Sequence, residues 1–300
     1  MKLPPFIRRA VPLAPLTAYQ IGGPAQYYTA PEDRDNLLKA LHWAENEKVE
    51  TFILGAGTNL LVSDRGFDGL IVHLHKFLDQ VKVDESSGVW TAGAGVKLTP
   101  FVRQTAQAGF AGVEALIGIP GTLGGALKMN AGAFSQEISN TLLSLEIIDE
   151  NQSIESMKPE DVGFDYRLAP GLDNKIVISA AFQLQQDDAE KLMQHVREIT
   201  ALRRNRQPLQ WPSCGSVFKR PEADFAGRLI EAAKLKGYTV GQAQIPEKHA
   251  NFIINLGGAK AGDVLSIIKT VKQRVFELSG ISLKREVILI GFTDEELIGS

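Results

Sequence analysis

Several stretches of the chain repeat hydrophobic residues at the spacing of an amphipathic helix. Between residues 31 and 47, Leu37, Leu41 and Ala44 fall on one face, and Pro31 with two acidic residues gives a typical helix start. Residues 187–204 form a second such pattern, which begins with acids and ends with arginines, as the helix dipole favours. Further helices are predicted over residues 99–109, 225–237 and 263–280, each ending at a glycine.

Shorter apolar runs, bounded by glycines or charged residues, predict strands. They do not alternate regularly with the helices, and no repeat period is present, so we expect an α+β fold rather than a regular βαβ array. The predicted strands lie on either side of a glycine turn within 51–62, and at 69–74, 88–96, 142–149, 176–184, 249–258 and 283–292.

The hydrophobic pattern breaks between residues 205 and 215, where two prolines interrupt it. We interpret this break as a domain boundary, with residues 1–200 before it and a second α+β unit over residues 201–300. The chain has 300 residues, of which 44% are hydrophobic, so each part can form a core.

Composition and charge exclude several classes of function. The formal net charge is −3, which argues against nucleic acid as the main partner, because that partner calls for a basic face. The single cysteine, Cys214, allows no internal disulfide. Prolines interrupt residues 1–16, which do not resemble a signal peptide, and no apolar run is long enough to span a bilayer. We therefore expect a cytoplasmic protein without a membrane partner.

Familiar metal and nucleophile motifs are missing from the sequence. No Gly-Lys dipeptide occurs, which excludes a Walker A loop, and neither HExxH nor GxSxG is present. His73 and His75 alternate along a predicted strand and could share a face. A packed or solvated histidine pair is the better explanation for them, so no metal site is predicted.

The first candidate binding stretch is LGAGTNLLV, over residues 54–62. Gly55 and Gly57 let the main chain approach a ligand, while Thr58 and Asn59 add side-chain donors. Main-chain N–H groups at such a turn bind phosphate. An ordinary tight turn explains the same residues equally well.

The second candidate stretch is IGIPGTLGGALKMNAGAF, which runs from Ile117 to Phe134 and contains five glycines. Where side chains are absent, a planar ring can lie against the main chain, and Thr122 and Asn130 could bond to its polar atoms. Pro120 would stiffen the turn. Taken alone, close packing of a helix on a sheet through small residues is the better explanation.

Together the two stretches resemble the FAD-binding module of the vanillyl-alcohol oxidase type. More closely, the chain resembles the shorter type of the UDP-N-acetylenolpyruvoylglucosamine reductase family. The resemblance spans Thr17 to Gly291. It implies an FAD-binding module over residues 1–200, which consists of two α+β subdomains split near residues 75–80. A smaller α+β substrate domain over residues 201–300 follows. The matching blocks are TAYQIGGPAQYY, GAGTNLLVSDRGFDGLIV, GIPGTLGGALKMNAGAF, GFDYR, PSCGSVFK, KHANFIIN and LKREVILIG.

The resemblance also implies an activity and its cofactors. Members of this family use NADPH to reduce FAD, and then reduce the enolpyruvyl ether of UDP-N-acetylglucosamine to UDP-N-acetylmuramate for peptidoglycan. We therefore expect FAD, NADPH and the enolpyruvyl sugar nucleotide as ligands of a monomeric enzyme. The residues implied in FAD binding are Gly55, Ala56, Gly57, Thr58, Asn59, Leu60, Gly118, Ile119, Pro120, Gly121, Thr122, Gly125, Asn130, Ala131 and Gly132.

Three residues are implied in catalysis, and each has a plainer explanation. Arg167 in GFDYR would bind the substrate carboxylate, although an arginine after an aromatic is usually part of a surface ion pair. Ser216, rather than Ser213, would protonate C2 of the substrate; otherwise it is a turn-forming serine. Glu286 would be a partly buried carboxyl of raised pKa that hydrogen-bonds the enol oxygen. The plainer explanation is a charged residue that faces water where a strand begins.

Further residues are implied to line the substrate side: Tyr166, Lys219, Lys248, His249 and Asn251. The chain departs from the family pattern at four positions, and none of these is a predicted catalytic residue. The departures concern the predicted contacts with the substrate, and they are Ala169, Arg220, Gln242 and Pro246.

Two features near the boundary have open interpretations. The cluster RRNR at residues 203–206 could attract anionic ligands, but a solvated helix end is the plainer explanation. Cys214 lies near Ser216, yet no neighbour in the sequence would lower its pKa, so we expect a packing residue.

Two other functions stay open on the sequence alone. One is a flavin- or nucleotide-binding protein without catalysis, which the joint presence of Arg167, Ser216 and Glu286 disfavours. The other is a flavin oxidoreductase that acts on a different small molecule, which a substrate screen would separate.

Overall fold

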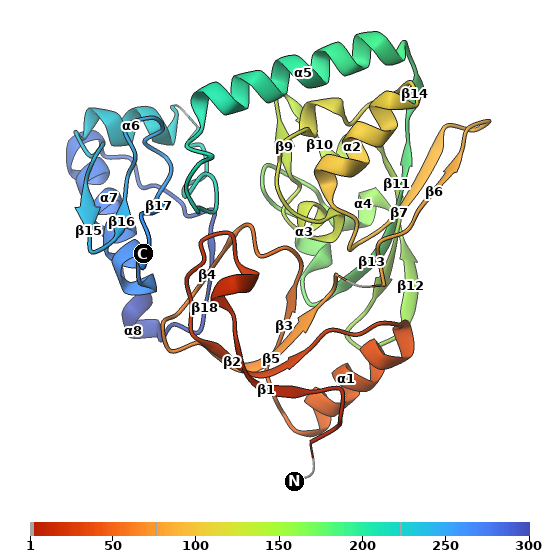
Figure 1. Cartoon of the computed structure of the whole chain (residues 1–300), viewed down its shortest axis with the longest axis horizontal. Helices are drawn as coiled ribbons and strands as arrows, with labels where there is room; N and C mark the ends of the chain where they lie inside the picture. The colour runs from red at the N-terminus through yellow and green to blue at the C-terminus, as the bar shows by residue number, and fades with distance from the viewer. Residues whose placement is uncertain (1–2, 76, 223) are drawn as a thin grey trace. The chain divides into compact units, whose positions relative to one another are not determined.

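The computed structural model describes residues 3–75, 77–222 and 224–300. Within them the chain forms two compact units that interleave along the sequence (Figure 1). The first unit comprises residues 3–7, Thr29–Ala56 and Ile71–Arg203. The second unit comprises Arg8–Tyr28, Gly57–Leu70 and Arg204–Ser300. Both units mix helices with mainly antiparallel strands, which confirms the α+β class.

The framework of the first unit is a five-stranded antiparallel sheet in the order β12-β11-β13-β7-β6. Its central strand β13 has the sequence IVISAAFQ, in which Ile178, Ala180 and Phe182 are buried at alternate positions, as the twofold period of a strand requires. The strands are β6 (Val81–Asp84), β7 (Val89–Gly93), β11 (Leu142–Ile148), β12 (Ile154–Met157) and β13 (Ile176–Gln183).

Two helices pack on this sheet through aromatic and small residues. In α2 (Leu98–Gln107), Phe101 lies edge-on to Trp90 of β7, with ring centroids 6.3 Å apart, and 5.5 Å from Phe182 of β13. The short helix α3 (Leu123–Lys128) contacts β7 and β13 (Figure 1). The sequence pattern predicted α2 with its glycine end, but not α3, whose glycines have low helix propensity.

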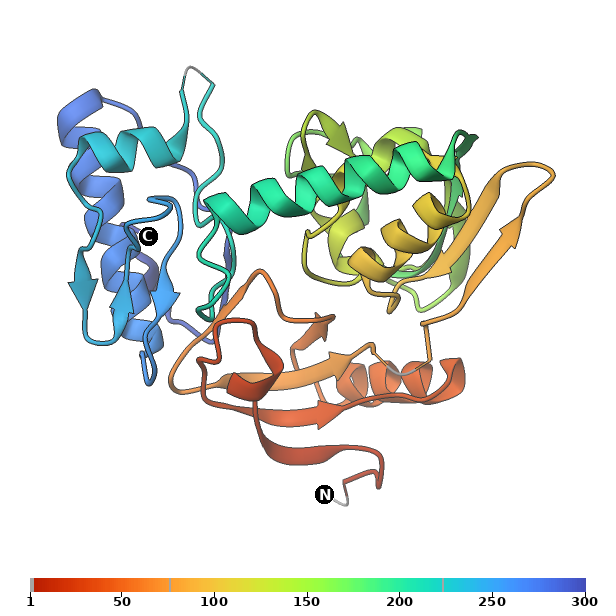
Figure 2. The ribbon, with the colours of Figure 1, turned by 45° about the horizontal axis from the view of Figure 1, so that its top comes forward.

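Helices α1 and α5 complete the predicted helices of the first unit. The carboxylate of Asp33 accepts a 2.7 Å hydrogen bond from the main-chain N–H of Asn36 and so caps α1 (Arg34–Asn46). Helix α5 (Ala189–Arg206) extends past the predicted end and passes into the second unit in its last turn (Figure 2). Its predicted apolar face consists of Leu192, Val196, Ile199 and Leu202. The first three are buried, whereas Leu202 is 39% exposed.

The remaining elements of the first unit are short. They are β3 (Thr51–Leu54), β8 (Phe110–Ala111), η2 (Glu114–Leu116), β9 (Gly132–Ala133), β10 (Gln136–Glu137), η3 (Ile138–Thr141), α4 (Pro159–Val162), η4 (Pro170–Leu172) and β14 (Gln185–Gln186). Strand β5 (Phe67–His73) begins in the second unit and ends in the first.

The second unit is assembled from strands that are far apart in the sequence. Its β4 pairs in parallel with β18, with Ile288 opposite Leu60. Helix α7 lies against β15 and β16, next to α6 (Figure 2). The elements are β1 (Arg8–Pro12), η1 (Ala14–Leu16), β2 (Pro24–Thr29), β4 (Leu60–Val62), α6 (Ala226–Ala232), β15 (Thr239–Val240), β16 (Ala243–Gln244), β17 (Ile254–Asn255), α7 (Ala261–Ser279), β18 (Ile288–Ile290) and α8 (Asp294–Leu297).

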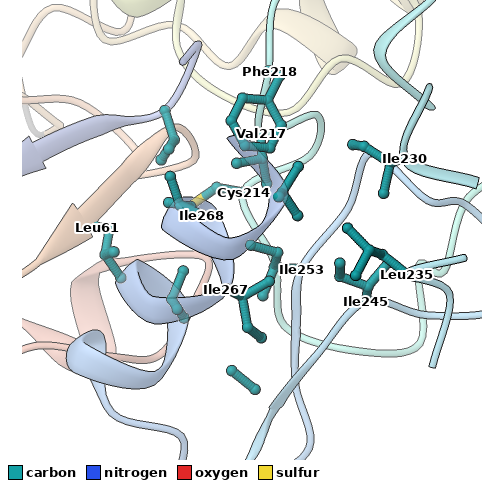
Figure 3. Close-up of a cluster of buried hydrophobic side chains, with 14 of the residues drawn as sticks. Leu61, Cys214, Val217, Phe218, Ile230, Leu235, Ile245, Ile253, Ile267 and Ile268 are labelled. Atoms are coloured by element: carbon teal, nitrogen blue, oxygen red, sulfur yellow. The ribbon is translucent and has the colours of Figure 1, made fainter. Parts of the chain in front are cut away.

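Helix α7 supplies much of the core of the second unit. Its buried residues include Ile267, Ile268 and Val271, at the spacing of one helical face, and they belong to the same cluster as Cys214 and Phe218 (Figure 3). The expected packing role of Cys214 is confirmed: the thiol is buried and donates to the carbonyl of Leu60, and burial raises its pKa well above the ordinary value.

Three predicted boundaries in the second unit are wrong. Helix α6 ends at Ala232 and not at Gly237, because Lys234 adopts a left-handed φ of 57° and turns the buried Leu235 back to the core. The run 249–258 contains only β17, since Asn251 bonds to residues 217 and 218 instead of to a sheet. The run 283–292 contains only β18.

Over the residues that the structure describes, no helix combines the length and the apolar character needed to cross a bilayer.

We predict that two glycines with left-handed φ differ sharply in their tolerance of a methyl group. Gly66 has φ 91° and its added Cβ would overlap the carbonyl oxygen of Pro24, whereas Gly280 has φ 70° and open space around the added atom. Gly280→Ala should therefore cost about 1 kcal/mol of unfolding free energy, from backbone strain alone. Gly66→Ala should cost more than about 3 kcal/mol, because main chain must move.

Urea unfolding of both variants, followed by circular dichroism, measures the difference. Equal unfolding midpoints for Gly66→Ala and Gly280→Ala would contradict the close approach of residue 66 to Pro24.

Candidate functional site

The glycines of the stretch 117–134 are of two kinds. Gly124, inside α3, packs on the sheet: an added Cβ would lie 2.9 Å from the Cβ of Ala94. Gly125, in the same helix, is exposed, and its added Cβ would meet only the Thr122 hydroxyl at 3.6 Å. Helix-to-sheet packing therefore explains Gly124 but leaves Gly125 unexplained.

Thr122 links the two candidate binding stretches. A Cβ added to Gly55 would lie 2.5 Å from the Thr122 hydroxyl oxygen, so the turn at residue 55 and the start of α3 are adjacent within the first unit. Gly118 and Gly121, with φ of 77° and 127°, require the conformational freedom of glycine here. The result is main chain without side chains around Thr122, a surface that fits a flat group such as a flavin ring.

The other half of the first stretch belongs to the second unit. The carbonyl of Gly57 accepts a 3.0 Å hydrogen bond from the N–H of Ala18, and an added Cβ at Gly57 would overlap the carbonyl oxygen of Leu16. The amide of Asn59 donates to the carbonyl of Glu286 at 3.1 Å. Leu60 begins β4. Asn59 thus holds the turn to residue 286.

Arg167 is anchored on the glycine stretch. Its guanidinium donates to the carbonyl of Asn130 at 3.3 Å and to that of Gly132 at 2.6 Å, and its carbon lies 5.0 Å from the ring centroid of Tyr166. Arg167 itself has φ 54°, an uncommon conformation that often marks functional sites.

The Asn130 side chain is engaged within the protein. It is fully buried and its amide donates to a carboxylate oxygen of Glu137 at 2.7 Å and to the carbonyl of Asp165 at 3.0 Å. The main chain of Asn130 and Gly132 is thereby fixed where Arg167 binds it. The intervening Ala131 is buried.

The histidine pair lies beside the first stretch. The ring centroids of His73 and His75 are 3.9 Å apart, so the two rings do share a face. Burial, and then the charge of His75, lower the pKa of His73 to about 4, although a hydrogen bond with the main chain of Gly55 opposes this. Sequence reasoning missed this contact with Gly55. Over the described ranges, no group of three possible metal ligands gathers.

Ser216 and Glu286 are neighbours in the second unit. The N–H of Glu286 donates to the carbonyl of Val217 at 2.8 Å, so the residue after Ser216 is bonded directly to residue 286. Both Ser216 and Glu286 are half-buried. Val217 and Phe218 are buried in the core shown in Figure 3, which fixes the segment that carries Ser216.

Asn251 braces the same segment from the other side. Its side-chain oxygen accepts from the N–H of Phe218 at 3.0 Å, its amide donates to the carbonyl of Phe218 at 2.9 Å, and its own carbonyl accepts from Val217 at 2.9 Å. His249 accepts from the N–H of Asn251 at 3.3 Å. Asn251 is thus a positioning residue for the serine segment, a role that its sequence did not reveal.

The two lysines predicted on the substrate side differ in setting. The N–H of Lys219 donates to the carbonyl of Lys284 at 2.8 Å, which extends the pairing between the serine segment and residues 284–287. Lys248 is exposed, and its ammonium donates to the carbonyl of Arg204 at 2.9 Å.

The predicted site residues therefore gather in two groups. The first unit brings together Gly55, the stretch 118–132, Tyr166 and Arg167, and the second brings together residues 57–60, Ser216, Lys219, residues 248–251 and Glu286. For RRNR, the solvated helix end is right for the exposed Arg204 and Arg206 and wrong for Arg203, which is half-buried.

Two segments of the chain match known protein families. Residues 25–157 match a family of FAD binding domains, and residues 207–290 match the C-terminal domain of UDP-N-acetylenolpyruvoylglucosamine reductase. The matched segments contain both glycine-rich stretches, Ser216 and Glu286.

Full-length relatives give the same result. UDP-N-acetylenolpyruvoylglucosamine reductases of Synechococcus sp. (strain JA-3-3Ab) and Rubrobacter xylanophilus are 41% and 43% identical, covering 97% and 93% of this chain and 94% of each relative. The crystal structure of the enzyme from Thermus caldophilus is 34% identical, with a TM-score of 0.82 over 95% of this chain and 100% of its own. The chain belongs to the UDP-N-acetylenolpyruvoylglucosamine reductase family.

Proposed function

We propose that this chain is an FAD-dependent reductase that converts the enolpyruvyl ether of UDP-N-acetylglucosamine to UDP-N-acetylmuramate, with NADPH as reductant, in the cytoplasm and for peptidoglycan. The observation that carries the proposal is the bond between Glu286 N–H and the Val217 carbonyl, which holds an acid beside a serine segment in a family member. We further propose that residues 1–200 form the flavin module, that residues 201–300 form the substrate domain, and that the protein is a monomer.

The main-chain surface around Thr122 supports the assignment of FAD. Gly125 leaves open space where a side chain would stand, while Gly118, which the stem of Arg203 covers in part, and Gly121 carry no side chain of their own. We assign these glycines, with Gly55, to the flavin ring. The turn at residues 56–60 is assigned to the pyrophosphate, where main-chain N–H groups suit an anion.

Bound FAD supplies the hydride chemistry, which takes two electrons from NADPH and delivers them as a hydride to C3 of the enolpyruvyl group. The electron pair of the double bond then collects at C2 and spreads into the carboxylate. The protein must neutralise this charge and add a proton to C2. Arg167 supplies a fixed positive charge for the carboxylate, already oriented by the Asn130 and Gly132 carbonyls.

Ser216 is the assigned proton donor. Its O–H bond breaks as the C2–H bond forms, and the alkoxide recovers its proton from water. A serine hydroxyl is a weak acid, but a carbanion-like C2 is basic enough to take the proton. Glu286 is assigned to hydrogen-bond the enol oxygen, and Asn251 keeps the serine segment in register through its three bonds to Val217 and Phe218.

The charged residues near these groups are assigned to the sugar nucleotide. Lys219 and Lys248 carry positive charge that suits a diphosphate, and Tyr166 offers an aromatic ring next to Arg167. His249 is assigned to positioning, since its ring nitrogen accepts from Asn251 and its ring packs 4.6 Å from that of Phe252.

We predict that Gly125→Gln separates stability from FAD binding. Glycine is a poor helix former, and glutamine at this exposed position meets no obstacle, so the FAD-free protein should keep its stability or gain up to about 1 kcal/mol. The added side chain would stand where the flavin is assigned, so FAD affinity should fall at least about tenfold, or about 1.4 kcal/mol.

The measurements are urea unfolding of the FAD-free protein and titration of flavin fluorescence. Gly262→Gln is the matched control, because Gly262 is also an exposed helical glycine with an ordinary contact of 3.8 Å to Asp64. Unchanged FAD affinity in Gly125→Gln would refute the assignment of this surface.

We predict that Ser216→Ala blocks only the second half of the reaction. Reduction of the bound flavin by NADPH should keep its rate, while reoxidation by the enolpyruvyl substrate should slow by about 10²–10⁴, the usual contribution of a proton donor. Ser213→Ala, three residues earlier, should slow neither step.

Anaerobic stopped-flow absorbance of the flavin follows both steps. Full turnover by Ser216→Ala would overturn the donor assignment. A flavin-containing wild-type protein that never reduces the substrate would favour a binding protein, and turnover of another compound only would favour a different oxidoreductase.

A further inference from the structure

Arg203 is an unusual arginine because it is half-buried in the first unit, and the ion pairs of the described residues do not include it. It belongs to α5, whose neighbouring arginines Arg204 and Arg206 are exposed, whereas Arg203 is half-buried. Its Nε atom is buried and has no hydrogen-bond partner among the described residues. A buried donor left without a partner costs stability, so its retention calls for an explanation.

The surroundings of Arg203 are the glycine stretch. A Cβ added to Gly118 would lie 2.8 Å from Cδ of Arg203, so the stem of the side chain covers the place where residue 118 has no side chain. The second neighbour is another cation. Burial, and then the positive charge of Arg167, lower the pKa of Arg203. The ion pairs within the described part of the chain include no acid bonded to Arg203.

Two guanidinium groups thus belong to side chains that contact the glycine stretch 117–134, each at a different part of it. Arg167 holds the main chain at residues 130 and 132, and Arg203 lies against residue 118. Two nearby cations repel each other, and burial removes the water that would screen them. Such a pair is stabilised by an anion that binds both, and most strongly by an anion of charge −2.

The proposed reaction creates such an anion for a moment. Before hydride transfer the enolpyruvyl carboxylate carries one negative charge, and after it the enolate and carboxylate together carry two. A single arginine matches the first state, whereas two match the second. A second cation therefore lowers the energy of the transition state more than that of bound substrate, which is what accelerates a reaction.

We propose that Arg203 is a second catalytic cation, which acts with Arg167 to stabilise the doubly negative enolate of the substrate; this inference rests on the proposed function. Arg203 donates or removes no proton in this role. It supplies a fixed charge.

The test compares Arg203→Gln with wild type in each half of the reaction. Flavin reduction by NADPH should stay within about threefold of wild type, and reoxidation by the enolpyruvyl substrate should slow by about 10²–10³, as for loss of one charge-stabilising donor. Affinity of the oxidised enzyme for the substrate, measured from the shift of the flavin absorbance, should fall by less than about tenfold, because the ground state needs only one cation.

Two further variants complete the design. Arg203→Lys keeps the charge without the planar fork and should recover part of the lost rate. Arg197→Gln removes an exposed arginine from the same helix and should change nothing. Unchanged flavin reduction in Arg203→Gln also shows that the variant is folded.

Three results would overturn the inference. Reoxidation at the wild-type rate in Arg203→Gln would remove any catalytic role. A loss of affinity as large as the loss of rate would make Arg203 a ground-state binding residue. An equal slowing of reduction by NADPH would show that its charge acts on the flavin instead. If wild type itself fails to reduce the substrate, the proposed function fails first, and this inference with it.

Discussion

The main chain of Glu286 joins three segments that are distant in the sequence, and the chemistry proposed for Ser216 and Glu286 depends on this junction. Its N–H donates to Val217, next to Ser216, and its carbonyl accepts from Asn59 in the glycine turn. Each bond contributes only about 0.5–1.5 kcal/mol net. Their value lies in direction, because together they fix the main chain of residue 286 relative to residues 59 and 217.

In the first unit, main chain is exposed at the surface while the core beneath it stays packed. Gly124 lets α3 approach β7 closely, and the neighbouring Gly125 leaves the opposite surface bare. The Arg167 guanidinium donates to the carbonyls at residues 130 and 132, so the same stretch serves the packing of α3 and the orientation of Arg167. A functional explanation and a structural one therefore apply to adjacent residues.

The sequence predicted the long elements well, because their periodicity reflects burial. Helices α2, α5 and α7 and strands β7, β11 and β13 lie where the apolar spacing indicated. It failed where a single polar contact decides the conformation: Asn251 binds Phe218 in place of a sheet partner, and Lys234 turns the chain after α6. No spacing rule detects such long-range bonds.

The candidate site was predicted from residue types and resemblance rather than from periodicity. Residue types in motifs identified Arg167, Ser216 and Glu286 through resemblance, and their chemistry was clear from the side chains. The sequence did not reveal the neighbours that hold these residues in place. They include the contact of His73 with Gly55 and the bonds of Asn251 to Phe218. Nor did it reveal that Nε of Arg203 is buried although Arg203 belongs to a basic cluster. Such contacts depend on which residues are neighbours in space. A linear pattern of charges therefore does not distinguish an exposed arginine from a partly buried one.

The parallel pairing of β4 with β18 has a consequence for synthesis. Leu60 is synthesised early, but its partner Ile288 belongs to the last strand of the chain. Strand β4 therefore cannot pair with β18 until most of the chain has been translated. The five-stranded sheet of the first unit needs only residues between Val81 and Gln183 and can assemble sooner. The glycine turn that precedes β4 therefore gains its bonds to residues 286–290 only after the five-stranded sheet can form.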